Sequence, residues 1–235
     1  MGKIVITGAS SGIGLAIAKR LASLGKPMIL QYRKNVEQLS DAVPDATLVK
    51  VDFSDLKAVE DFAASLDDVE ILVNAAAVTE TGLLPTLETE SIEKMISVNI
   101  LATTLLCRAI LPRMCLKRKG VIVNISSVTA QKVYRGQSVY GGTKAYIETL
   151  SKGIAAECSK KGVRCNCVAP GSILSGTMEK LVISTAGTDL KGVNASDRFG
   201  TPDDVAAAVE FLCSDNSNYI NGAVLAVNGG FWLGI

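Results

Sequence analysis

The stretch Gly120-Val-Ile-Val-Asn-Ile-Ser-Ser-Val128 is followed, after eleven further residues, by Tyr140-Gly-Gly-Thr-Lys144. The apolar, β-branched run inside the first segment predicts a buried strand, with Ser127 at its end. The second segment opens a helical pattern, and its four-residue spacing places Tyr140 and Lys144 on one face of the helix. A buried strand that leads into a helix is the unit from which α/β proteins are built, so this stretch sets the expected fold class.

The tyrosine and the lysine form a chemically meaningful pair. A cationic amine one turn away favours the phenolate over the phenol, and an unperturbed tyrosine exchanges protons poorly at neutral pH. The hydroxyl of Ser127, at the strand end, could hydrogen-bond a substrate carbonyl beside Tyr140. Tyrosine and lysine also occur at this spacing as a packed ring and a solvated amine, so the pair needs support from the rest of the chain.

Segments with strand and helix patterns alternate along the chain. The expected strands are 3–7, 27–32, 47–51, 70–73, 121–125, 163–169 and 223–227, and the expected helices are 13–24, 55–66, 87–118, 138–161 and 202–213. This order predicts one α/β domain over residues 1–235, of Rossmann type, with a doubly wound parallel sheet and helices on both faces. Residues 172–198 have the least regular pattern.

Composition narrows the classes of function. The chain has 235 residues, a formal net charge of +1 and no histidine, which excludes a Ser-His-Asp triad and any histidine-ligated metal. Six cysteines lack zinc-ligand spacing, so we expect buried reduced thiols and no metal. Balanced charge gives no sign of nucleic-acid binding, and no apolar run approaches a membrane span. The first residues already have a strand pattern, so we expect no targeting peptide and a cytoplasmic location.

A glycine-rich turn lies between the first expected strand and helix. Its spacing is Gly8-x-x-x-Gly12-x-Gly14. Glycines let the backbone bend tightly and approach a pyrophosphate, and the helix N-terminus adds N–H donors and a favourable dipole. The turn therefore predicts a dinucleotide site.

Several motifs occur in one order with suitable spacing: Thr7-Gly-Ala-Ser-Ser-Gly-Ile-Gly14, Asn74-Ala-Ala-Ala77, Asn99, Ser127, Tyr140-x-x-x-Lys144 and Pro170-Gly171. From Lys3 to about Gly230 the chain resembles the short-chain dehydrogenase/reductase family. The resemblance implies hydride transfer from a nicotinamide to a carbonyl carbon. It makes Ser127 the carbonyl ligand and Tyr140 the proton donor. Lys144 then assists Tyr140 and holds the nicotinamide ribose, and Asn99 distorts its helix and holds a water.

The same resemblance and the glycine-rich turn assign the cofactor contacts to Gly8, Ser10, Ser11, Gly12, Ile13, Gly14, Asp52, Asn74, Ala75, Tyr140, Lys144, Pro170, Gly171, Ile173 and Ser175. Asp52 is expected beside the adenine and Ile173 against the carboxamide. Ser175 and Thr177 remain alternatives for one contact, because this segment is one residue longer than the common pattern. Ala77 replaces the usual glycine, and residues 172–198 correspond to the family's substrate lid.

The end of the second expected strand predicts the nucleotide. An acid here binds a free ribose 2′-hydroxyl, but this chain has Arg33 and Lys34, and its first acid is Glu37. Two cations suit a 2′-phosphate, so we expect NADP(H), although an exposed basic turn would look the same. Ser11 departs from the basic residue that many NADP-preferring relatives have before Gly12.

Within the family, the chain most resembles 3-oxoacyl-[acyl-carrier-protein] reductases, which implies an acidic carrier protein as partner. Arg118 and Lys161 match basic positions that those enzymes use for docking. We expect them near the active-site mouth, although helix ends favour cations in any case. A reductase of free ketones, sugars or alcohols is the alternative, and a nucleotide-binding regulator without turnover is a third. Apolar residues on several faces of helices 87–118 and 139–161 predict a homotetramer.

Overall fold

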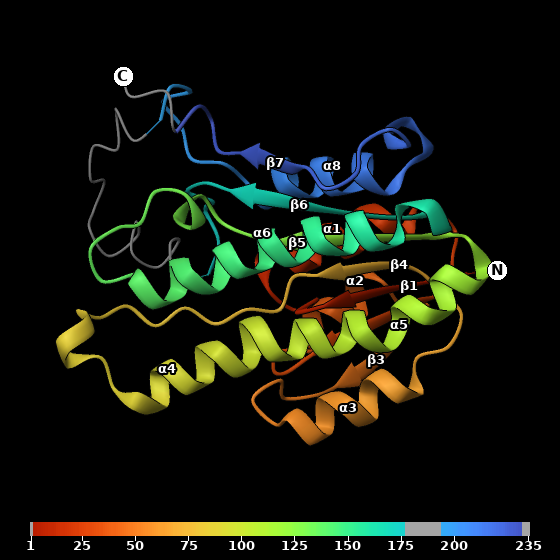
Figure 1. Cartoon of the computed structure of the whole chain (residues 1–235), viewed down its shortest axis with the longest axis horizontal. Helices are drawn as coiled ribbons and strands as arrows, with labels where there is room; N and C mark the ends of the chain where they lie inside the picture. The colour runs from red at the N-terminus through yellow and green to blue at the C-terminus, as the bar shows by residue number, and fades with distance from the viewer. Residues whose placement is uncertain (1, 177–193, 232–235) are drawn as a thin grey trace.

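The computed structural model describes residues 2–176 and 194–231. Seven parallel strands form one sheet in the order β3-β2-β1-β4-β5-β6-β7. Their bounds are β1 Lys3–Thr7, β2 Met28–Tyr32, β3 Thr47–Lys50, β4 Val69–Asn74, β5 Gly120–Ile125, β6 Val163–Pro170 and β7 Val224–Val227. Because the strands are parallel, all their carboxyl ends lie on one edge, at the left of Figure 1.

Helices cover both faces of the sheet. One face carries α1 Gly12–Ala22, α2 Glu37–Ala42 and α8 Pro202–Cys213, and the other carries α3 Leu56–Ser65, α4 Thr89–Met95, α5 Thr103–Lys117 and α6 Ser138–Cys158 (Figure 1). Between α4 and α5 runs a π-helical segment, Ile96–Ala102. Short 3-10 turns are Leu84–Thr86, Val128–Ala130, Ser159–Lys161 and Asp215–Ser217. The predicted doubly wound α/β fold is confirmed.

Two apolar layers follow from the alternation of side chains along each strand. In β1, Ile4 and Ile6 join the layer beneath α1 and α8, whereas Val5 between them joins the layer beneath α3 and α5. Since both faces are covered, successive residues are all apolar, as in other buried parallel strands.

The helical run 89–117 is long and apolar. By length and composition alone it could span a membrane, because an 18-residue window has a mean hydropathy of 1.6. A core helix meets the same criteria, and Val98, Leu106 and Ile110 here are buried against the sheet. The run is therefore accounted for by packing inside the protein.

Two details differ from the expected elements. The helix α2 was not predicted, because six residues give too little periodicity and no side chain caps its start. The first helix ends at Ala22 rather than at residue 24, and Gly25 follows with φ 62°. Four of the six cysteines are buried as expected, whereas Cys115 and Cys213 are partly exposed.

Candidate active site

The predicted motifs meet at the carboxyl edge of the sheet. The glycine-rich turn follows β1, Asp52 follows β3, Ser127 follows β5, and Pro170 ends β6. In open parallel sheets this edge is where ligands bind. Helix α6 starts at the same edge, so its first turn brings Tyr140 to the ends of β5 and β6.

The structure places Lys144 between the Tyr140 ring and the strand end that leads to Ser127. The Ser127 hydroxyl is partly exposed and lies 2.7 Å from the Thr129 hydroxyl. Lys144 is only 4% exposed; its Nζ donates to the Ile125 carbonyl at 2.8 Å and lies 5.8 Å from the centroid of the Tyr140 ring. An ammonium offers three N–H donors, so this anchor leaves two for other partners.

A second connection between β5 and α6 was not among the predicted site features. The buried Ser126 hydroxyl donates to Oε1 of buried Glu148 at 2.9 Å and lies 3.3 Å from the Lys144 carbonyl oxygen. Glu148 is four residues after Lys144, on the same helix face, and that spacing was a signal in the sequence. Together with the Lys144–Ile125 bond, this contact fixes the strand end that carries Ser127 against the helix that carries Tyr140.

Asn99 lies inside the π-helical segment, so the expected local distortion of this helix is present. The side chain is 1% exposed, and both of its polar atoms form hydrogen bonds. Its Oδ1 accepts from the Val78 amide at 2.8 Å, and its Nδ2 donates to the Val78 carbonyl at 2.9 Å and the Thr143 hydroxyl at 3.1 Å. Thr143 in turn donates to the Tyr140 carbonyl at 2.7 Å. Asn99 therefore ties the chain after β4 to the first turn of α6.

The glycine-rich turn is a cradle that side chains would fill. A Cβ at Gly8 would lie 2.7 Å from the Ala76 amide nitrogen, and one at Gly14 would lie 2.1 Å from the Gly8 carbonyl oxygen. Ser11 caps α1, because its hydroxyl accepts from the Gly14 amide at 3.0 Å. A Cβ at Gly12 would lie 2.8 Å from Cβ of Ser175, so Ser175 is beside this turn.

Next to the cradle is a cavity of about 270 Å³ at the ends of β1, β2, β3 and β4. It is lined by Gly8, Ser10, Ser11, Gln31, Arg33, Lys34, Asn35, Val51, Asp52, Phe53, Ala75, Ala76, Ala77, Val78 and Val98. Six predicted cofactor contacts are in this lining, and so is Ala77, which replaces the usual glycine.

Gln31 shapes this cavity and was not predicted as a site residue. It is 2% exposed; its Oε1 accepts from the Gly8 amide at 2.8 Å, and its Nε2 donates to the Val51 carbonyl at 2.7 Å. A buried amide inside an apolar strand needs partners, and that requirement was the available signal. Through Gln31, the glycine-rich turn and the end of β3 are held at a fixed separation.

Charge at the cavity is divided between Arg33, Lys34 and Asp52. Both cations are exposed at the end of β2. The Ser54 amide and hydroxyl donate to Asp52 and, with the charges of Arg33 and Lys94, hold the pKa of that carboxyl below its usual range. Asp52 is therefore an anion here, and the exposed guanidinium of Arg33 is close enough to influence it.

The remaining predicted residues have different surroundings. The Asn74 side chain points into the protein, where its Nδ2 donates to Oδ1 of Asn124 at 2.8 Å, so only its backbone is at the edge. The Gly171 amide donates to the Val227 carbonyl, and Ile173 is buried beside Gly200. Ile13 is partly buried on the first turn of α1. Thr177, the alternative to Ser175, lies outside the described residues.

The thiols are not suited to nucleophilic chemistry. Burial raises the pKa of Cys107 to about 12 and that of Cys167 to about 11. A nucleophilic cysteine needs a depressed pKa, so these side chains serve as small apolar residues.

The basic cluster 117–119 and 160–161 is not near the active-site mouth, which corrects the expectation. These residues directly precede β5 and β6, and so lie at the amino edge of the sheet, opposite Ser127. Lys117 pairs with Asp68, and Lys119 pairs with Glu70 at 2.9 Å. The expectation rested on these residues being at the ends of two helices. Residues before a strand lie at the amino edge of a parallel sheet, whereas Ser127, which follows β5, lies at the carboxyl edge.

A doubly wound sheet with a glycine cradle at β1 and a Ser–Tyr–Lys group at β5 and α6 defines a nicotinamide-dependent oxidoreductase. A family model described as enoyl-(acyl carrier protein) reductase matches residues 8–232. The 3-oxoacyl-[acyl-carrier-protein] reductase of Rickettsia prowazekii is 34% identical over 96% of this chain and 95% of that protein. The chain belongs to the short-chain dehydrogenase/reductase family.

Another relative is named for a different substrate. The 2-(R)-hydroxypropyl-CoM dehydrogenase of Xanthobacter autotrophicus is 35% identical, over 97% of both chains. Among solved structures, ElxO with NADP bound superposes with a TM-score of 0.89 at 29% identity, over 99% of both chains. The two curated relatives are thus similar to this chain to the same degree but are named for different substrates.

Proposed function

We propose that this protein uses NADPH to reduce a 3-oxoacyl thioester, carried on acyl carrier protein, to the 3-hydroxyacyl thioester. The observation that carries this proposal is that buried Lys144 joins the Tyr140 ring to the strand end that leads to Ser127, at the sheet edge where the glycine cradle also lies. The cradle has no room for an added side chain, as expected of a turn that packs closely against a dinucleotide. NADPH, when bound, supplies the hydride for the carbonyl carbon.

The side chains of the protein have separate tasks in this reaction. Ser127 donates a hydrogen bond to the substrate carbonyl oxygen and so orients it. Tyr140 gives its phenolic proton to that oxygen as negative charge develops there. Lys144, anchored by the Ile125 carbonyl, places its ammonium group 5.8 Å from the centroid of the Tyr140 ring and keeps two N–H donors for other partners.

Three features support NADPH over NADH. Arg33 and Lys34 are exposed cations at the cavity, and no acid follows β2 until Glu37. A planar guanidinium also suits a 2′-phosphate, because it can donate two parallel hydrogen bonds. Solved relatives have been seen with either nucleotide, ElxO with NADP and 4-hydroxyisoleucine dehydrogenase with NADH, so the preference rests on these residues.

An acyl substrate is supported by the apolar rim around Tyr140. Leu83, Leu84 and Val133 are all more than a third exposed, and a Cβ at Gly141 on the catalytic helix would lie 3.2 Å from Cγ2 of Val133. The Gly82 amide donates to the Gly136 carbonyl at 3.0 Å, which joins the two segments that carry these side chains. Apolar side chains at a cleft mouth favour an aliphatic chain over a sugar.

The test compares Tyr140→Phe with Tyr146→Phe. Tyr146 is a matched control on the same helix, with its hydroxyl 3.1 Å from the Thr104 hydroxyl. We expect Tyr140→Phe to lower kcat for acetoacetyl thioesters by about 10²- to 10⁴-fold, the usual contribution of a positioned proton donor, while NADPH still binds. Tyr146→Phe should remain within about twofold of the parent protein.

Substrate class is tested by rates with NADPH on one panel: an acetoacetyl carrier thioester, free ketones, sugars, and a 2-enoyl thioester. Fastest turnover of the 3-oxoacyl thioester supports the proposal. Turnover of free carbonyls alone would show instead that the protein is a reductase of free ketones or sugars. Reduction of the enoyl thioester alone would show that the double bond, not the carbonyl, is the target.

A further inference from the structure

The loop Lys132-Val-Tyr-Arg135 lies at the entrance to the site. It starts five residues after Ser127 and ends five residues before Tyr140, so it connects the two catalytic elements. All four side chains are exposed. A Cβ at Gly141, next to Tyr140, would lie 3.2 Å from Cγ2 of Val133, so the loop contacts the start of α6.

Contacts on both sides hold this loop in place. The Tyr134 and Phe231 rings are 5.8 Å apart, and Nζ of Lys132 lies 5.1 Å above the Phe231 ring. On the other side, the Gly136 carbonyl accepts from the Gly82 amide. The loop that carries Lys132 and Arg135 is therefore held in one position, with both charged groups exposed to solvent.

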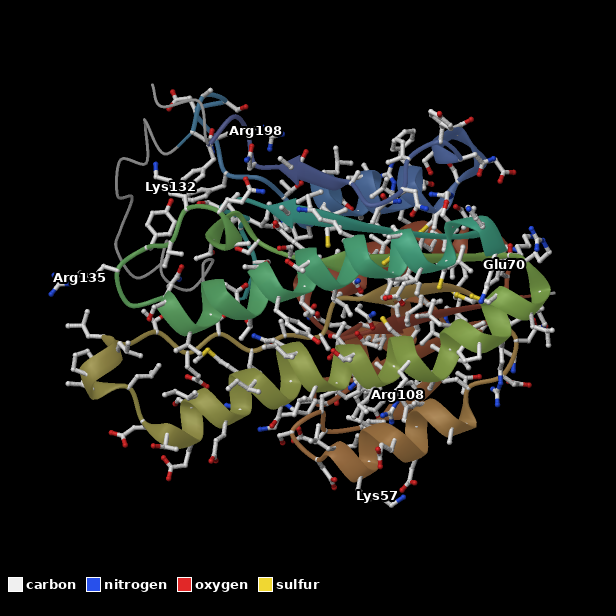
Figure 2. All side chains as sticks on the ribbon, in the orientation of Figure 1. Lys57, Glu70, Arg108, Lys132, Arg135 and Arg198 are labelled. Carbon is white, nitrogen blue, oxygen red and sulfur yellow. The ribbon has the colours of Figure 1, made fainter. Side chains whose placement is uncertain are left out.

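The charges of Lys132 and Arg135 are not neutralised by the rest of the described chain. Within residues 2–176 and 194–231, neither side chain forms an ion pair, whereas Arg198 is paired with Asp204. In Figure 2 both cations project at the end of the molecule opposite Glu70, the residue that neutralises Lys119. Among the described residues, the positive charge at this end of the molecule is thus not balanced by an ion pair.

We propose that Lys132 and Arg135 bind the phosphate of the pantetheine arm that carries the acyl thioester. This inference rests on the proposed function and names the part of the substrate that the loop recognises. Between the two cations, Val133 and Tyr134 continue the apolar rim toward Tyr140. The entrance therefore matches a substrate that is apolar near the reacting carbonyl and anionic at the far end of its carrier arm.

The experiment uses two acetoacetyl thioesters with NADPH. Acetoacetyl-CoA carries the phosphate, and acetoacetyl-N-acetylcysteamine is a neutral thioester without it. The loop variant is Lys132→Glu with Arg135→Glu. We expect the ratio of the KM for the CoA thioester to the KM for the neutral thioester to rise by about tenfold, as two favourable surface contacts become repulsive. Added salt should raise this ratio in the parent protein.

The matched control is Lys160→Glu with Lys161→Glu. It changes the formal net charge by the same four units, but at the amino edge of the sheet. An equal rise of the KM ratio in this control would show a general field effect and overturn the proposal. An unchanged ratio in the loop variant would overturn it as well.

Two further measurements are needed. The first distinguishes the two possible sources of negative charge, and the second tests this inference independently of the proposed function. If the loop variant weakens only the carrier-protein thioester and not the CoA thioester, the acidic carrier surface is the ligand and the phosphate assignment is wrong. Binding of acetoacetyl-CoA to the NADPH complex of Tyr140→Phe needs no turnover. Weaker binding after the loop changes supports the inference even if the reaction differs from the one proposed, and unchanged binding refutes it.

Discussion

Gly14→Ala is the substitution that probes the cofactor cradle most directly. The added Cβ would lie 2.1 Å from the Gly8 carbonyl oxygen and 2.9 Å from Cα of Ala9. Both are backbone atoms, so no side chain can turn aside. To relieve this clash, α1 and the turn must separate by roughly 1 Å. A displacement of that size lowers the reaction rate by about 10²-fold where geometry is critical. Overpacking adds about 1–3 kcal/mol of destabilisation.

The control is Gly142→Ala, where an added Cβ meets nothing within 4 Å and the residue is exposed on α6. Alanine there should raise the free energy of unfolding by about 0.5–1 kcal/mol, because it is the better helix former. NADPH affinity is measured by quenching of Trp or NADPH fluorescence, and stability by urea denaturation. If Gly14→Ala binds NADPH within twofold of the parent protein, the cradle is not the pyrophosphate site.

Arg33→Ala should reduce kcat/KM with NADPH at least tenfold more than with NADH, because one charge-assisted contact is worth about 1.5–3 kcal/mol. Equal losses of kcat/KM with the two cofactors would show that Arg33 does not contact the nucleotide. Ellman's reagent at pH 8 should leave the native thiols of Cys107 and Cys167 unmodified, since a thiol is neutral below its pKa; rapid reaction in folded protein would contradict their burial. The Arg198 guanidinium holds the pKa of Asp204 well below its usual range, so Asp204 stabilises the fold fully above about pH 4 and progressively less as the pH falls toward that lowered pKa. Asp204→Asn should cost about 1 kcal/mol at pH 7, and progressively less below about pH 4, in urea titrations. Leu101 and Tyr146, exposed on neighbouring helices, favour a homotetramer; a monomer in light scattering at micromolar concentration would disprove it.

Sequence periodicity predicted the strands well, because burial on both faces leaves an unbroken apolar run. Most strand ends agree within one residue. Strand β6 ends at Pro170, one residue later than expected, because a proline has no N–H to donate and can still occupy the end of a strand. The grouping of Ser127, Tyr140 and Lys144 followed from helix spacing and strand order. The distortion around Asn99 came only from family resemblance, since no propensity scale distinguishes a π segment from an α-helix.

The failures concern contacts that depend on tertiary position. Gln31 and Glu148 are buried polar residues whose partners, Gly8 and Ser126, are about 20 residues away, so local patterns do not show them. The basic cluster was misplaced because the expectation overlooked that these residues precede the expected strands 121–125 and 163–169, which puts them at the amino edge of a parallel sheet. Asn74 was assigned to the cofactor, yet its side chain faces the opposite direction, into the layer beneath α6.

That buried layer sets the register of the catalytic helix. Asn74 donates to Asn124, and Asn124 Nδ2 donates at 2.7 Å to the hydroxyl of Ser151 on α6. If α6 slid by one turn, about 5.4 Å, Ile147 or Ala155 would take the place of Ser151, and neither side chain can accept a hydrogen bond. The orphaned amide would cost about 1–3 kcal/mol. Three buried polar side chains thus permit one alignment of α6, the alignment in which Nζ of Lys144 reaches the Ile125 carbonyl.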